Sequence, residues 1–529
     1  MSIVDTIVII VYLIIVLFTG YFVGKDNKDQ EDYFLAGRAM NWFPVALSVA
    51  ATMISANGFI GGPGWAYLDG MSPFMINVAV PFAIFFSMFV TTPIIYKLKV
   101  TSVYQYMNYR FGNICRNLTV LQFFINSLIQ VSSMVFIPSI IVEKITGWSL
   151  TIVVPIIVVI ALIYTLVGGL KAVIWTDAIQ MFVVWGSVIF VIYTALKKAD
   201  MSLLDSIVYA KEAGKLNTLD FSFDITKPNT FWATLIGGSI FWIRYFAFDQ
   251  IQIQRILSAK SIKNLKASLF TSALVSNITY FFMLFVGIIL FAFFNGRIFK
   301  ASNDVMIEFI LENIPVGVVG LVIAGVFAAS MSSVDSILNS MTTVFIKDIY
   351  EEYFSKDKKE ATLSFLMIVS AVLGIIIIIF VLVGFKGSVK SVLDVVGGYI
   401  SYFSGPACGV FLLAIFTKKA NDKGSALGFI FGFIIGLYLA KTYNIFWIIN
   451  PAIGAFITFI TGYIFSFIIP TKTNKSDIEK YTIFGISKLQ NESAEDIKYG
   501  IPLKFDKYSV SVLVFFFIQY IILFILQYC

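Results

Sequence analysis

Runs of about 20 apolar residues recur from one end of this chain to the other. A run of that length crosses the hydrocarbon core of a bilayer as one α-helix, which satisfies its own backbone hydrogen bonds. Of the 529 residues, 59% are hydrophobic and only 13% are charged, more apolar surface than a soluble fold of this length could bury. The sequence therefore predicts an all-α polytopic membrane protein with one integral membrane domain.

Apolar runs bounded by Gly, Pro and charged residues predict about 14 transmembrane helices. Their approximate spans are 3–23, 40–62, 72–96, 118–142, 149–167, 174–196, 231–253, 267–295, 304–345, 362–385, 391–416, 425–440, 445–470 and 509–528. The first run has no basic residues before it and no small-residue cleavage site, which indicates a retained helix rather than a signal peptide.

The basic residues are unevenly distributed between the predicted loops. Lys and Arg gather in every second loop, the pattern of loops that stay on the cytoplasmic side. This distribution predicts a multi-pass protein of the inner (plasma) membrane with both termini outside, and hence an even number of spans. The net charge of +7 is spread over those short loops, so no nucleic-acid partner is expected.

Residue types that enzymes use for chemistry are scarce. The chain has no histidine, and Cys115, Cys408 and Cys529 lie far apart, which leaves no metal-ligand or disulfide spacing. A membrane enzyme would need a cluster of acids or a nucleophile beside a base, and the sequence shows neither pattern. We therefore expect no catalytic residues, and no feature indicates an obligate protein partner.

Two predicted spans are interrupted by glycine-rich segments. Residues 55–58 and 61–64 break the second span, and Gly237 and Gly238, followed by Ser239, break the seventh, five helices later. Matching breaks in two five-helix halves are typical of an inverted repeat, whose freed carbonyls can hold a cation. The alternative is that Gly and Pro are simply common in membrane helices.

A serine-rich face marks the ninth span. Ala329, Ser332, Ser333 and Ser336 share one side of a helix, where hydroxyls and carbonyls could supply the oxygens that a hard cation prefers. The alternative is close helix packing, with each hydroxyl bonded back to its own helix. Asp335 favours the cation-binding interpretation over close packing, because a carboxylate inside a membrane is costly and usually faces a partner or a polar path.

Asp177 is the other acid beside a predicted membrane segment. Two interpretations stay open from its position: a charge favoured by the helix dipole, or a group on the path of cation release.

Four segments, in order, carry a resemblance to a known family. They are GGLKAVIWTD (168–177), DQIQIQR (249–255), GVFAASMSSVDSILNS (325–340) and, more weakly, GPACGVFLL (405–413). Over nearly its whole length the chain resembles the sodium/solute symporter family, which includes sodium/glucose, proline, sialic-acid, iodide and monocarboxylate carriers.

The resemblance implies a five-plus-five inverted-repeat core with one extra helix before it. It divides the chain into an N-terminal helix and loop (1–39), a first repeat (40–196), a second repeat (231–417) and peripheral helices (425–529). The implied function is sodium-coupled secondary active symport, importing a small organic solute by alternating access with Na⁺ as the coupling ion.

The resemblance also implies where cations bind. The sodium site is expected from the backbone carbonyls of Ala51, Ile54 and Ala329 and the hydroxyls of Ser332 and Ser333. A second cation site, present in some members, would comprise Asp177, Asp335 and Ser336 beside Ser332. Asp335 stands where those members have a serine, so the ion stoichiometry and the use of protons stay open.

The solute is less constrained. Candidate pocket residues are Asn57, Asn77, Gln130, Trp242, Arg244 and Tyr245. Sugar carriers have polar side chains where this chain has Gly58, Asn77 and Gly397, and the arginine of sialic-acid carriers aligns with Gln130. Arg244 would either meet a solute carboxylate or form a salt bridge with an acid such as Asp249.

Three kinds of function stay open at this stage. The chain would carry a sugar or similar solute, an organic anion such as sialic acid or a monocarboxylate, or act as a transport-fold sensor without flux.

Overall fold

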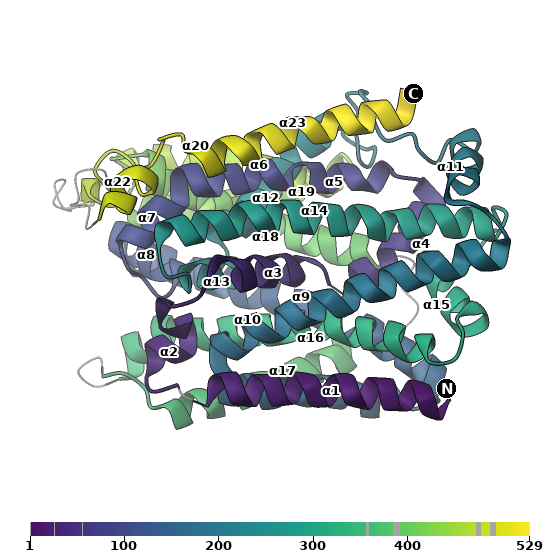
Figure 1. Ribbon diagram of the computed structural model, residues 1–529. Helices are drawn as coiled ribbons and strands as arrows, with labels where there is room; N and C mark the ends of the chain where they lie inside the picture. Colours follow the sequence, from purple (N-terminus) through teal and green to yellow (C-terminus); the bar gives the residue numbers. More distant parts are fainter. Residues whose placement is uncertain are drawn as a thin grey trace.

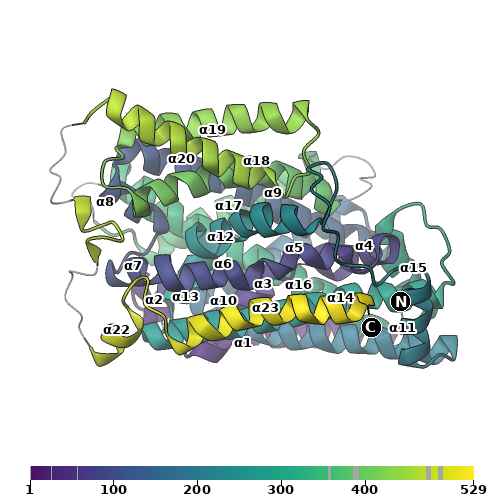
Figure 2. The ribbon, with the colours of Figure 1, turned by 90° about the horizontal axis from the view of Figure 1, so that it is seen from above.

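The computed structural model describes residues 2–25, 27–55, 57–355, 359–384, 392–471, 478–486 and 493–528. These residues form an all-helical bundle, and its long helices run from one end of the molecule to the other (Figures 1 and 2). The one β-type contact among them is an isolated bridge between Met40 and Ala259. Within the described ranges, 11 helices are long and apolar enough to cross a membrane, or 12 if one bent pair counts as a span. The all-helical membrane fold predicted from the sequence is confirmed.

The helices of the first half are α1 (Ile3–Gly24), α2 (Gln30–Leu35), η1 (Ala36–Arg38), α3 (Trp42–Met53), η2 (Asn57–Gly61), α4 (Gly62–Asp69), η3 (Ser72–Phe74), α5 (Met75–Val78), α6 (Val80–Phe86), η4 (Ser87–Thr91), α7 (Thr92–Lys97), α8 (Val103–Arg110), α9 (Asn113–Thr146), α10 (Leu150–Ala199) and α11 (Leu203–Glu212). Those of the second half are η5 (Ala233–Gly238), α12 (Ser239–Phe248), α13 (Gln250–Leu257), α14 (Ile262–Phe293), α15 (Ser302–Asn313), α16 (Val318–Val344), η6 (Phe345–Phe354), α17 (Leu363–Gly384), α18 (Val392–Phe416), α19 (Asp422–Thr442), α20 (Asn450–Ile468), α22 (Ala494–Tyr499) and α23 (Lys507–Tyr528).

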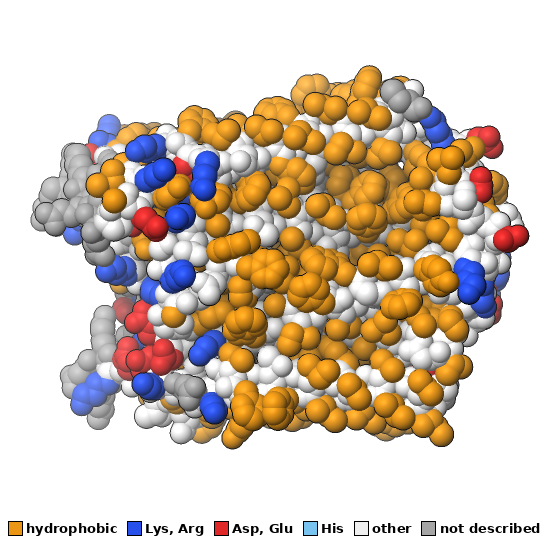
Figure 3. Space-filling model, in the orientation of Figure 1, with side chains coloured by type: hydrophobic (Ala, Val, Ile, Leu, Met, Phe, Trp, Pro, Cys, Tyr) orange, Lys and Arg blue, Asp and Glu red, His pale blue; other side chains and the backbone are white. Residues whose placement is uncertain are grey.

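The two ends of the bundle differ in charge. Figure 1 shows both chain termini at one end, with α11 and α15, and we call this the termini end. Figure 3 shows Lys and Arg side chains gathered at the opposite end, which we call the basic end, and a broad hydrophobic belt between the two. Lipid covers such a belt, because its hydrocarbon core excludes charged side chains.

The break predicted in the second span is present. α3 ends at Met53, a π-helical turn follows from Asn57, and α4 then runs at an angle of 63° to α3. Small residues let α14 pack directly against the far side of the break. A side chain on Gly287 of α14 would place its Cβ 2.1 Å from the backbone oxygen of Pro63.

The break predicted at Gly237 and Gly238 in the seventh span lies elsewhere. These glycines belong to the π-helix η5, which continues directly into α12. The chain leaves the helix at Asp249, whose backbone is extended and whose Oδ1 accepts a hydrogen bond from the Ile251 N–H at 2.9 Å. The predicted position of this break was wrong, because the π-helix η5 accommodates both glycines and the break falls at Asp249, whose side chain caps the start of α13.

Two other boundaries differ from the prediction. α10 joins the predicted spans 149–167 and 174–196 into 50 residues with a sharp change of direction at Gly169 (φ 54°), a conformation that favours glycine. The predicted span 304–345 is divided into α15 and α16, and the backbone N–H groups of Gly317 and Gly320 donate to Asp5 of α1 at 2.7 and 2.9 Å. A carboxylate at a helix start satisfies donors that the helix itself leaves free.

Replacing Gly287 with Ala is expected to destabilise the protein by about 1–3 kcal/mol, because the added methyl group would overlap the backbone of the broken span. Thermal stability of the purified protein in detergent, followed by the fraction that stays monodisperse, measures the effect. Gly186→Ala on α10 is the matched control, since an added Cβ there meets nothing within 4 Å. An equal loss in both variants would contradict the close packing of α14 on the break.

Candidate functional site

The residues expected to hold sodium lie where the end of α3 faces the middle of α16. The two helices touch through the hydroxyls of Thr52 and Ser336, whose oxygens are 3.3 Å apart. Around this contact the expected sodium ligands Ala51, Ile54 and Ala329 are buried.

At the end of α3, two backbone carbonyls accept no backbone hydrogen bond from a described residue. In a continuous helix the N–H of Ser55 would donate to the Ala51 carbonyl and that of Gly58 to the Ile54 carbonyl. Here Gly58 donates to the Ser55 carbonyl instead, and no described residue donates a backbone hydrogen bond to the Ala51 or Ile54 carbonyl. Oxygens of this kind are available to a cation.

Two hydroxyls on α16 complete the expected set. Ser333 donates to the Ala329 carbonyl one turn earlier, at 3.1 Å, as the packing alternative requires. The Ser332 hydroxyl is buried beside the Asp177 carboxylate and makes no hydrogen bond of ordinary geometry in the described part of the chain. A hydroxyl oxygen held in this way can serve as a cation ligand.

The two intramembrane acids lie in the same polar cluster. Asp177 accepts a hydrogen bond at 2.5 Å from Ser48 of α3, and its carboxylate also interacts with the Ser332 hydroxyl of α16. Asp335 accepts from the Tyr164 hydroxyl at 2.6 Å and lies 3.1 Å from the Ser336 hydroxyl. The structure thus brings the three residues of the expected second cation site together, and Asp177 is fully buried within the bundle.

A fixed cation that the sequence analysis missed lies in this cluster. Arg255 of α13 is 0% exposed, and its guanidinium lies 3.7 Å from the Asp177 carboxylate. The same group donates to Ser48 at 3.0 Å and to Ser336. Its motif, DQIQIQR, was visible in the sequence, but its position just beyond an apolar run suggested a loop.

A cavity opens beside the break. It has a volume of about 160 Å³, comparable with the roughly 150 Å³ engineered cavities that bind benzene. Its lining comes from the broken span, from α5, α9, α12, α14 and α18, and from the loop after α19: Met53, Ser55, Gly58, Trp65, Ile76, Asn77, Gln130, Ser133, Met134, Phe241, Trp242, Tyr280, Val396, Gly397, Ile400 and Trp447. None of these lining residues is charged.

Three predicted pocket residues line this cavity, namely Asn77, Gln130 and Trp242. The indole of Trp242 is fixed by a hydrogen bond to the Ile76 carbonyl at 2.8 Å. The side chain of Asn57, a fourth candidate, lies outside the described part of the structure. Trp65, Tyr280 and Trp447 were not predicted, because single aromatic residues in apolar runs carry no sequence signal that separates lining from packing.

The remaining two candidates face away from the cavity. Arg244 is buried and its Nη2 lies 2.5 Å from Oδ2 of Asp249, which is the salt bridge that the sequence analysis gave as the alternative to solute binding. Tyr245 is buried, and its hydroxyl points to the Thr52 carbonyl at 3.5 Å. The pair of charges closes the end of α12, and the tyrosine packs against the broken helix.

Comparison with known proteins decides the family. A sequence profile of the sodium:solute symporter family matches residues 33–432. The chain belongs to this family. Sodium-coupled symport, the function class predicted from the sequence, is thereby confirmed.

Individual relatives agree with this assignment. The sodium/sialic acid symporter NanT of Aliivibrio fischeri is 27% identical over 480 residues, which are 89% of this chain and 94% of the relative. The human sodium-coupled monocarboxylate transporter 1 is 28% identical over 430 residues, 79% of this chain and 69% of the relative. A solved Na⁺-coupled sialic acid symporter in a substrate-bound outward-open state superposes with a TM-score of 0.79 at 27% identity, covering 88% of this chain and 98% of that one.

Replacing Arg255 with Gln is expected to destabilise the protein by about 3–5 kcal/mol, because it leaves buried acids without their cation. Adding Asp335→Asn should restore part of that stability by removing one formal negative charge from the same cluster. Thermal unfolding of both variants in detergent measures the difference. An Arg255→Gln protein as stable as the wild type would contradict the role given to this guanidinium.

Proposed function

We propose that this symporter imports a small, uncharged organic solute with hydrogen-bonding groups, together with Na⁺, across the plasma membrane. The observation that carries this proposal is the lining of the central cavity, which offers the amides of Asn77 and Gln130 and the hydroxyl of Ser133 between indole rings, and no charge. Amides and hydroxyls match the hydroxyl or amide groups of a neutral solute, and aromatic faces pack against its apolar side.

We propose the following path for the chain through the membrane. The repeats span 40–196 and 231–417, the helices before and after them are peripheral, and 14 crossings result if α10 turns back at Gly169 and the short α12 helix counts as a span. The termini end then lies outside and the basic end inside, which is supported by the cluster of Lys and Arg there (Figure 3).

Sodium coupling then follows from the position of the break. Na⁺ binds to the free carbonyls of Ala51 and Ile54, to the Ala329 carbonyl and to the hydroxyls of Ser332 and Ser333. Because Met53, Ser55 and Gly58 of the same break line the cavity, an ion that fixes the break also fixes one wall of the solute site. Binding of either partner thus favours binding of the other, which is the linkage that symport requires.

A second cation at Asp177, Asp335 and Ser336 has separate support. Arg255 forms an ion pair with Asp177, whereas Asp335 contacts only the hydroxyls of Tyr164 and Ser336 among the described residues, so one formal negative charge in the buried cluster has no cation beside it. A buried charge is costly unless it is paired. One further monovalent cation would balance this cluster.

The second candidate is a carrier of organic anions, and the names of the sialic-acid and monocarboxylate relatives favour it. The cavity argues against it, because the one arginine on α12, Arg244, is already paired with Asp249. The family assignment favours transport over the third alternative, a sensor without flux, and uptake measures the difference.

Uptake into proteoliposomes tests the choice of solute. Labelled sugars and polyols, sialic acid and lactate are offered with an inward sodium gradient and with choline in its place. We expect sodium-dependent uptake of an uncharged member of this panel, stimulated by an inside-negative potential because the net charge moved is that of Na⁺. Uptake restricted to sialic acid or lactate would favour the anion carrier, and uptake that ignores sodium would contradict symport.

Replacing Ser333 with Ala is expected to raise the sodium concentration for half-maximal uptake by about tenfold, equivalent to about 1.4 kcal/mol for one lost ligand. The matched control is Ser330→Ala on the same helix, because the Ser330 hydroxyl donates instead to the Met134 carbonyl of α9 at 2.6 Å. Unchanged sodium dependence in the Ser333 variant would remove this residue from the site.

A further inference from the structure

A short segment outside the matched part of the chain lies against the central cavity. Residues 443–449 join α19 to α20 at the termini end, beyond residue 432 where the family profile stops. The segment packs closely on η5, since a Cβ on Gly237 would lie 2.1 Å from the backbone oxygen of Ile448. Ile448 itself is fully buried, so the segment is wedged between helices rather than loose on the surface.

One side chain of this segment, Trp447, lines the cavity. Its ring is half-buried, and its centroid lies 5.7 Å from that of Phe241 on α12 in an edge-to-face arrangement. On the other side it packs on α18, where a Cβ on Gly397 would come within 3.1 Å of the indole. The indole therefore bridges α12 and α18 across the rim of the cavity.

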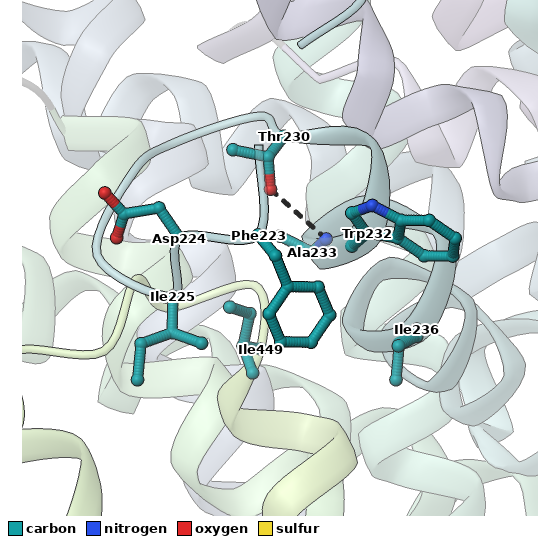
Figure 4. A pocket seen from close by; sticks show the side chains of 8 residues that line it. All are labelled: Phe223, Asp224, Ile225, Thr230, Trp232, Ala233, Ile236 and Ile449. Carbon is teal, nitrogen blue, oxygen red and sulfur yellow. Dashed lines mark hydrogen bonds between the residues drawn. The ribbon is translucent and has the colours of Figure 1, made fainter. Parts of the chain in front are cut away.

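A second layer covers the segment from outside. The N–H of Phe446 donates to the Ile225 carbonyl at 2.8 Å, which ties the segment to the long loop between α11 and η5. In Figure 4, Ile449 lies between Ile225 and the ring of Phe223, both from that loop, and Trp232 lies on the other side of Phe223 in the same apolar pocket. The loop thus holds the segment down on the bundle.

We propose that residues 443–449 form an outer lid over the solute cavity and that Trp447 is a specificity-determining residue, whose ring limits the size of solute that enters from the termini end. The inference rests on the proposed function only in taking this cavity as the solute site. A tryptophan suits the task because it offers a large, rigid face with few rotatable bonds. The solute class it favours is one with a flat apolar face to stack on the indole.

Access of thiol reagents to the cavity tests the lid without knowledge of the solute. Ser133→Cys, a change of one atom in the lining, serves as the reporter in a Cys529→Ser background, and Cys115 and Cys408 are buried. The probes are two membrane-impermeant methanethiosulfonates, one small and one bulky, added from outside to oriented vesicles. The Trp447→Ala variant should react with the bulky reagent about tenfold faster, while the small reagent gains much less.

Trp232→Ala is the matched control, because Trp232 belongs to the outer pocket of Figure 4 and not to the central cavity. In the Trp232→Ala variant, the bulky reagent should label the Ser133→Cys reporter at the same rate as in the reporter protein without a tryptophan substitution. An unchanged rate for Trp447→Ala, or equal gains in both tryptophan variants, would overturn the lid. Absence of labelling in the Trp447→Ala protein would do so too, since removal of the ring must open the cavity.

Uptake gives the second readout. With the transported member of the panel, Trp447→Ala should raise the KM for solute and relax discrimination against larger analogues, while the sodium concentration for half-maximal uptake and the yield of folded protein stay as in the wild type. Trp447→Phe should restore much of the discrimination. A wild type without sodium-dependent uptake would instead refute the proposed function and leave the labelling result to decide the lid by itself.

Discussion

A backbone carbonyl that leaves a helix inside a bilayer must find another partner, because the hydrocarbon holds no water to replace the lost hydrogen bond. The end of α3 places two such carbonyls, those of Ala51 and Ile54, in the buried middle of the bundle. Much of the surrounding structure accommodates them. α14 packs on the far side of the break at Gly287, and α16 turns its serine face toward it. We propose that a monovalent cation is the partner of this set of oxygens.

The buried charges link this site to the rest of the core. Arg255 contacts Ser48 on α3, Asp177 on α10 and Ser336 on α16, so one side chain joins three helices to α13. A change in the charge of this cluster must therefore be felt by the helix that carries the break. The acid cluster contacts α3 at Ser48, and the cavity that Trp447 lines includes Met53 and Ser55 of the same broken span, so ion and solute binding can depend on each other.

The sequence predicted features that local pattern encodes. Apolar runs gave the helical membrane fold, and the glycine-rich stretch after Ser55 gave the true break in the second span. Asp335 and Asp177 were identified because a carboxylate is conspicuous among apolar neighbours. Features set by contacts between distant segments were missed. From the sequence, Arg255 was assigned to a loop, whereas in the structure α13 packs between α3 and α16 and buries this side chain. Gly237 was predicted to break a helix, but it lies within the π-helix η5.

The residues of the solute site were likewise predicted only in part. Asn77 and Gln130 were found as polar residues in apolar spans, whereas Trp447 had no sequence signal, because its role arises only when the segment after α19 reaches across α12 and α18. Arg244 was the most conspicuous solute candidate in sequence, and Asp249 neutralises it in the structure.

Equilibrium binding of radioactive sodium to the purified protein, measured without solute, tests the proposed sodium site between the end of α3 and α16 most directly. The account predicts saturable binding that potassium and choline do not displace, and that weakens strongly when Ser332 and Ser333 are both replaced by Ala while Ser330→Ala leaves it unchanged. Sodium binding of wild-type strength in the double variant, or none in the wild type, would contradict it.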